Sequence, residues 1–221
     1  MPVRTFLLVI AVVVSISAVG LAQGDRAEAI GAASDATLSA AVRQSLEGKG
    51  YRLVLADGTQ LAEVWLCSHL PEQAKKETAG VLYSQLTDSE LVGVLHFSEA
   101  ASDFRGQSVA AGFYTLRYGL MPSDGNHLGA PPNRDFLLLI PAGSDPDPST
   151  KFEFQKLIVL SRQASASKHP AVLSMVQPGE SKTAALSRDE EDHYVFSGSV
   201  KLSSGTEMPI AFVVKGVVQQ Q

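Results

Sequence analysis

The segment from Met121 to Asp135, MPSDGNHLGAPPNRD, holds the densest group of side chains that could do chemistry. Their amide, imidazole, carboxylate and guanidinium groups could bind a ligand, and the candidate binding residues are Asp124, Asn126, His127, Asn133 and Arg134. A connection of about fifteen residues between two strand patterns is far longer than a hairpin loop and is typically either functional or disordered. Three prolines restrict its backbone, so the sequence predicts a stiffened recognition loop.

The five histidines are the next candidates, because histidine ligates metals and moves protons. None of them stands in a paired metal-ligand spacing. We therefore predict no metal and no cofactor, and keep a three-dimensional site built from His69, His96 and His127 as an alternative. His96 would share its strand face with Val92 and Val94, which favours a hydrogen-bonded structural role for this histidine.

Motifs for catalysis are absent or incomplete. The sequence GQSVA around Ser108 resembles a nucleophile elbow but lacks its final glycine and a strand–turn–helix context. Asp124 and Asp135 could approach each other as glycosidase carboxylates do. However, Asp135 next to Arg134 is more simply the salt-bridged start of a strand. We predict no catalytic residue.

The N-terminus predicts export. Arg4 precedes the unbroken apolar run Phe6–Val14, and Gly20 and Ala22 are small residues that would place cleavage before Gln23. An uncleaved anchor is the alternative, although the roughly 17 residues from Phe6 to Ala22 are near the lower limit for a membrane span. We expect a secreted or periplasmic protein that is free of the membrane after cleavage.

The net charge narrows the classes of partner that the chain is expected to bind. Removing the predicted signal, whose only charged residue is Arg4, would change the formal net charge from −5 to −6. A mildly acidic chain without a basic run is a poor binder of nucleic acid. An unknown small molecule, glycan or protein remains as the expected partner, and the oligomeric state is open.

Cys67 is the only cysteine, so it cannot form an intramolecular disulfide. Cys67 and Trp65 are both expected in the core.

The elements that would position these residues are mostly strands. Nine patterns are predicted as strands: Tyr51–Ala56, Gln60–Cys67, Gly80–Leu86, Leu91–Ser98, Gly112–Leu120, Phe136–Ile140, Ala171–Gln177, Tyr194–Leu202 and Met208–Val218. Gly112–Leu120 alternates as a strand with one buried face does, whereas the apolar run Phe136–Ile140 indicates burial on both faces.

Two helices are predicted. One spans Ala36–Leu46, with Asp35 as its N-cap and Gly48 as its stop signal. The other spans Ser149–Gln163, where Thr150 and Glu153 fit a capping box.

Together these elements predict a mainly β fold, an antiparallel, jelly-roll-like β-sandwich of about nine strands with one or two short helices. The expected organisation is a signal peptide (1–22), a flexible N-terminal segment with a short helix (23–45) and a single β-rich domain (46–221). Residues 23–34 are rich in Ala and Gly and are expected to be frayed.

Four sequence segments carry a family resemblance: YRLVLADGTQLAEVWL, GFYTLRYGLMPSDGNHLG, NRDFLLLIPA and HPAVLSM. They resemble a group of uncharacterised secreted bacterial proteins that are similar to the DUF2911-like domains of unknown function. The resemblance spans most of residues 51–176. It implies a secreted β-rich domain, and it transfers neither an activity nor a functional residue.

The leading hypothesis is therefore an exported, non-catalytic β-sandwich that binds a ligand or partner. A metal-dependent enzyme using His127 with His69 or His96 is the first alternative. A structural component of the cell envelope is the second.

Overall fold

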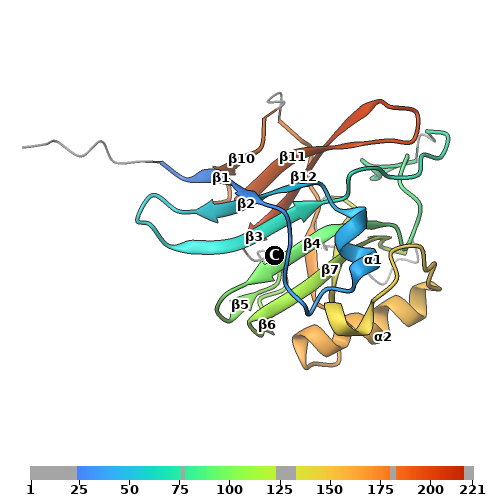
Figure 1. The fold of residues 1–221 in the computed structure, drawn as a ribbon, viewed down its shortest axis with the longest axis horizontal. Helices are drawn as coiled ribbons and strands as arrows, with labels where there is room; N and C mark the ends of the chain where they lie inside the picture. The colour runs from blue at the N-terminus through green and yellow to red at the C-terminus, as the bar shows by residue number, and fades with distance from the viewer. Residues whose placement is uncertain (1–23, 76–77, 123–132, 180–182, 217–221) are drawn as a thin grey trace, which may run out of the picture.

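A computed structural model of the chain describes residues 24–75, 78–122, 133–179 and 183–216 (Figure 1). Within these residues the largest sheet has seven antiparallel strands in the order β1-β2-β3-β4-β7-β8-β9. Their bounds are β1 Arg26–Gly31, β2 Lys49–Val54, β3 Gln60–Leu66, β4 Leu91–Phe97, β7 Gly112–Leu120, β8 Asp135–Pro141 and β9 Val172–Ser174. Apart from the two short strands between β4 and β7, strands adjacent in this sheet are consecutive along the chain.

A smaller sheet, in the order β10-β11-β12, packs over one face of the large sheet. Its strands are β10 Ala185–Arg188, β11 Tyr194–Lys201 and β12 Glu207–Lys215, and a two-residue-per-strand hairpin joins β5 Ala101–Ser102 to β6 Ser108–Val109. The helices are α1 Ala40–Ser45 and α2 Phe154–Ser165, with a 3-10 turn at Ala142–Ser144. The prediction of a mainly β, antiparallel sandwich with two short helices is confirmed.

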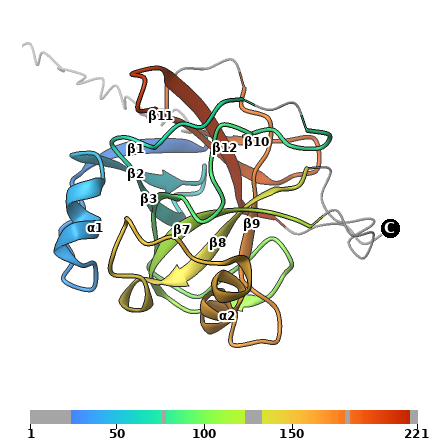
Figure 2. The same cartoon turned by 90° about the vertical axis from the view of Figure 1, so that its right-hand side faces the viewer.

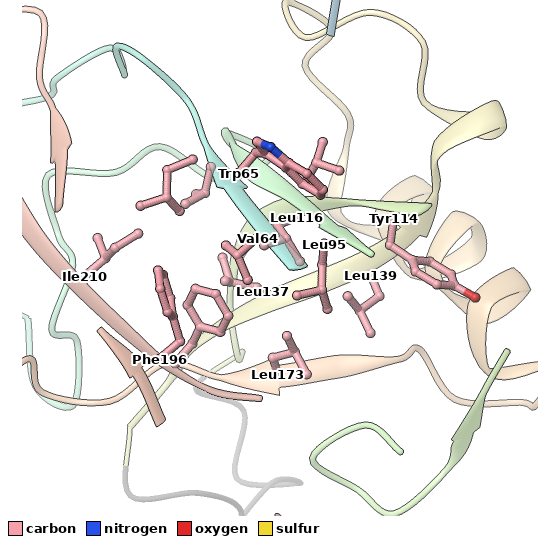
Figure 3. Close-up of a cluster of buried hydrophobic side chains, with 14 of the residues drawn as sticks. Val64, Trp65, Leu95, Tyr114, Leu116, Leu137, Leu139, Leu173, Phe196 and Ile210 are labelled. Carbon is pink, nitrogen blue, oxygen red and sulfur yellow. The ribbon is translucent and has the colours of Figure 1, made fainter. Parts of the chain in front are cut away.

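The core lies between the two sheets (Figure 3). Alternate residues of the central strands point into it, because side chains of a strand alternate between its two faces. From the large sheet these include Val64, Leu95, Leu116 and Leu137, and the small sheet places Phe196, Ile210 and Phe212 against them. All seven side chains are completely buried, so each contributes roughly 1.5–3 kcal/mol through removal of apolar surface from water.

The outer face of β7 and β8 is also covered. Leu157 and Leu160 of helix α2 pack in one buried cluster with Leu138 and Ile140 of β8. Figure 2 shows α2 lying beside β8. The continuous apolar run of β8 was thus a correct sign of burial on both faces. The prediction that β7 has only one buried face is wrong, because the connection from β8 to α2 covers its other face.

This covered face contains a fully buried ion pair that the strand pattern did not reveal. Arg117 of β7 donates from Nε and Nη2 to the two carboxylate oxygens of Asp145, at 2.8 and 2.7 Å, and both side chains are 0 % exposed. The remaining guanidinium hydrogens reach the backbone carbonyls of Ser89, Asp147 and Thr150 at 2.8–3.0 Å. Every donor of the guanidinium is therefore used, and the pair fastens the connection to the sheet.

Two predicted element assignments are wrong. Residues 24–34 include strand β1, whose pairing with β2 runs from Arg26 opposite Val54 to Gly31 opposite Lys49. Its backbone hydrogen bonds order a segment with few large apolar side chains. Gly80–Leu86 is not a strand but a series of turns, because the N–H groups of Leu82 and Tyr83 bind a side chain instead of a neighbouring strand.

The helix caps differ from the prediction, although both helices exist. Ser39, not Asp35, caps α1 by accepting a hydrogen bond from the N–H of Val42 at 3.0 Å. Helix α2 begins after Glu153, whose side chain makes no capping bond, so the predicted capping box does not form. The short strands β5, β6 and β10 were not predicted, because two to four residues are too few to show a period.

Candidate functional site

The two described ends of the long connection between β7 and β8 are tied together and to the segment 78–86. The N–H of Met121 donates to the carbonyl of Arg134, and Arg134 Nε donates to the carbonyl of Met121, both at 2.8 Å. The N–H of Arg134 reaches the carbonyl of Gly80, also at 2.8 Å, and Asn133 Nδ2 lies 3.5 Å from the carbonyl of Met175. Asn133 and Arg134 thus have positions at the base of the connection.

Three of the five predicted binding residues, Asp124, Asn126 and His127, lie outside the described residues. Of the predicted set, the structure therefore brings together only the adjacent pair Asn133 and Arg134. Residues 123–132 of the connection are not described, so the candidate site consists of residues at the base of the connection.

Asp135 is the anchor of that base. Its side chain is completely buried at the start of β8. One carboxylate oxygen accepts the N–H of Leu82 at 2.8 Å, and the other accepts the N–H of Tyr83 at 3.0 Å and the hydroxyl of Tyr118 at 2.7 Å. The expected ion pair of Asp135 with Arg134 is absent from the ion pairs of the described residues, because backbone N–H groups and a phenol solvate this carboxylate.

The two tyrosines extend this network into the core. The Tyr83 hydroxyl donates to the carbonyl of Val176 at 2.7 Å and accepts the N–H of Ala211 at 2.9 Å. Burial raises the pKa of Tyr83, and burial together with the hydrogen bond to Asp135 raises the pKa of Tyr118. Both phenols therefore stay protonated as donors, and they hold the segment 78–86 between the two sheets.

An open hollow lies on the solvent side of this segment, which is part of the connection from β3 to β4 along the chain and is drawn in teal green in Figure 1. It is open to solvent and has a volume of about 510 Å³. Its described lining residues are Lys75, Thr78, Ala79, Val81, Leu82, Ser84 and Gln177. We call this feature the polar hollow, because an ammonium, two hydroxyls and an amide line it.

The backbone around the polar hollow is held in place. Gly80 has φ +70°, a conformation that residues with a Cβ rarely adopt, and it lies against the aliphatic stem of Arg134. Leu82 is fixed through Asp135, and the carbonyl of Ser84 accepts Gln73 Nε2 at 3.1 Å. The hollow and the base of the long connection are therefore one continuous region.

The sequence reasoning missed the polar hollow because it treated residues 80–86 as a strand. The sequence GVLYSQL places Val81, Leu82 and Tyr83 consecutively, so it lacks the strict alternation of a half-buried strand. That irregularity, next to the polar run before Thr78, was the available signal.

Of the alternative histidine site, the structure describes His69 and His96. His96 Nδ1 lies 3.1 Å from Glu63 Oε2, and its ring stacks on Phe113 with centroids 4.1 Å apart. His69 is exposed and lies three residues beyond the end of β3 at Leu66. His127 is outside the described residues. Within the described ranges, no group of three or more His, Cys, Asp or Glu side chains could hold a metal ion.

The remaining candidates have structural surroundings. Trp65 is 5 % exposed and donates from Nε1 to the carbonyl of Gly31 at 2.9 Å. Burial raises the pKa of the Cys67 thiol to about 12, so this thiol is unreactive at neutral pH. Ser108 is in the β5–β6 hairpin rather than in a nucleophile elbow.

Over the part of the chain with described structure, no helix has both the length and the apolar character needed to cross a bilayer. Comparison of the chain with protein-family models, with curated proteins and with solved structures finds no match in any of the three.

Proposed function

We propose that this protein is an exported, non-catalytic β-sandwich that binds a small polar molecule in the polar hollow. The observation that carries the proposal is an open volume of about 510 Å³ whose backbone is fastened by the buried Asp135 network. A site held by hydrogen bonds within the protein loses little freedom when a ligand binds, and this favours affinity.

The chemistry of the lining supports binding rather than catalysis. General acid–base catalysis is most often carried by an imidazole or a carboxylate within hydrogen-bonding distance of the reacting atom. Among the described lining residues the polar groups are the ammonium of Lys75, the hydroxyls of Thr78 and Ser84, and the amide of Gln177. No carboxylate or imidazole stands among these described lining groups to act as a base beside a hydroxyl.

Export is part of the proposal and rests on the sequence of residues 1–22. A charged n-region, an apolar run and small residues before Gln23 are the features that signal peptidases use. Mass spectrometry of the protein released by an expressing cell tests this directly. The expected chain begins at Gln23, and a mass that retains Met1–Ala22 would contradict export with cleavage.

Binding is tested with a thermal-shift panel of inorganic phosphate, citrate, glucose and N-acetylglucosamine. A ligand present at ten times its Kd stabilises the folded state by about 1.4 kcal/mol. For a chain of this length that corresponds to a rise in Tm of about 3–6 °C.

The variant Ala79→Trp fills the hollow from an exposed position, and Val159→Trp adds the same side chain on the exposed face of α2 as a control. The proposal predicts that at least one probe raises the Tm of the wild type and of Val159→Trp, while Ala79→Trp shows no rise. Equal responses of all three proteins, or no response from any, would refute it.

A further inference from the structure

The charges around the polar hollow are unevenly distributed. Lys75 is the only ionic group among its described lining residues. We infer that the hollow takes a ligand with an anionic group, a carboxylate, phosphate or sulfate, and that Lys75 makes the ionic contact. This inference rests on the proposed function and names its ligand class.

Asp135 and Asp88 are two described carboxylates near the hollow, and Asp135 is already engaged. Both oxygens of Asp135 face the N–H groups of Leu82 and Tyr83 and the hydroxyl of Tyr118, away from the solvent side. Burial raises the pKa of the Asp88 carboxyl, while a backbone hydrogen bond from Leu120 and the charge of Arg134 act in the opposite direction. Neither carboxylate is a lining residue, so the ammonium of Lys75 has no acidic neighbour in the described lining.

The neutral groups of the lining complement an oxyanion. Hydroxyls and the amide NH₂ can each donate a hydrogen bond, and an ammonium donates up to three. Ser84 lines the hollow and is 8 % exposed, and its carbonyl is held by a hydrogen bond from Gln73. Donors that surround one cation form a charge-assisted set of the kind that recognises carboxylate and phosphate.

The lining argues against the other ligand classes. Saccharide sites commonly present an aromatic ring for stacking, and no aromatic side chain is among the described lining residues. A cation would need carboxylate or carbonyl oxygens facing the hollow. The formal net charge of −5 repels anions from the chain as a whole, so affinity must come from these short-range contacts.

The test is isothermal titration of the purified protein with citrate, inorganic phosphate and N-acetylglucosamine at constant ionic strength. Lys75→Gln removes the charge and Lys75→Arg restores it, while Lys168→Gln removes an exposed charge that does not line the hollow. Ala79→Trp blocks the hollow. Lys75 is exposed, so replacing it tests binding without disturbing the core.

We expect citrate or phosphate to bind the wild type. Lys75→Gln should weaken this binding about three- to tenfold, the range for a charge-assisted contact that water partly screens. Lys75→Arg and Lys168→Gln should stay within about twofold of the wild type, and Ala79→Trp should abolish binding.

Different failures have different meanings. If N-acetylglucosamine binds, is blocked by Ala79→Trp and is unaffected by Lys75→Gln, while the anions do not bind, the anionic inference is wrong and the proposed function stands. If no probe binds, or if every bound probe binds Ala79→Trp as tightly as the wild type, both are wrong. Anion binding that is equal in Lys75→Gln and the wild type also overturns the inference.

Discussion

The buried pair of Arg117 and Asp145 gives the sharpest stability prediction. Replacing Arg117 with Met keeps much of the side-chain volume but removes the cation. Asp145 then keeps a hydrogen bond from the Thr115 hydroxyl, 2.6 Å away, while its negative charge remains 0 % exposed without a counter-ion. The carbonyls of Ser89, Asp147 and Thr150 lose the donors that Arg117 supplies.

The expected cost follows from this geometry. Removing one partner of a buried ion pair typically costs about 3–5 kcal/mol, because an uncompensated charge stays in the interior. Native proteins are stable by only about 5–15 kcal/mol, so Arg117→Met should remove a large part of the total. At about 2–4 °C for each kcal/mol in a chain of this length, the fall in Tm is roughly 6–20 °C.

Arg52→Met is the matched control. Arg52 is also a strand residue, and it pairs with the carboxylate of Glu63 at 3.0 Å. The side chain of Arg52 is 43 % exposed. A pair that water screens contributes about 0–1 kcal/mol, so this control should remain close to the wild type.

Urea denaturation followed by fluorescence and circular dichroism measures both variants. Trp65 is the single tryptophan and is 5 % exposed, so its emission reports loss of the sandwich core. A lower midpoint with an unchanged slope identifies a change in stability. If Arg117→Met costs less than about 1 kcal/mol, as expected for Arg52→Met, then the buried pair does not hold the connection to the sheet.

Three further predictions concern the base of the site and the core. Asp135→Asn should cost about 1–3 kcal/mol, because an amide NH₂ would face N–H donors; Asp192→Asn, 86 % exposed, is the control, and equal urea midpoints for the two variants would disprove the anchor. Gly50→Ala should cost about 1–3 kcal/mol of stability, because the added Cβ would lie 2.3 Å from Trp65 Nε1. Gly48→Ala is the control, because a Cβ there meets nothing within 4 Å. Similar thermal stability of both variants would contradict this packing. Cys67 should resist thiol reagents at pH 8 and react fully in guanidinium, since its thiol has a pKa of about 12 when buried; rapid labelling of the native protein would show that the thiol is accessible.

Much of the fold could be predicted because its signals are local. The Asp57-Gly58 turn between two strand patterns predicted the β2–β3 hairpin, and Gly58 does adopt a positive φ of 88°. The alternation in residues 112–120 matched β7, and the apolar run 136–140 matched the burial of β8 on both faces. These properties depend on turn geometry and on the period of the side chains, which neighbouring residues specify by themselves.

The candidate site was predicted only in part. The sequence pointed to the connection around residues 121–135, and the anchoring role suggested for its end is found at Asp135. The partner was wrong, since the carboxylate binds the N–H groups of Leu82 and Tyr83 more than fifty residues away in the chain rather than the adjacent Arg134. The polar hollow went unpredicted for the same reason.

The sequence by itself determined the β-rich class, most central strands, the two helices and the inward placement of Trp65 and Cys67, because these follow from short-range patterns of polarity. Only the tertiary structure decided that Arg117 is buried against Asp145, that residues 78–86 are turns and that Lys75, Ser84 and Gln177 line one hollow. Each of these depends on residues brought together from distant parts of the chain. Their energies come from burial and pairing in three dimensions, which a local sequence pattern does not specify.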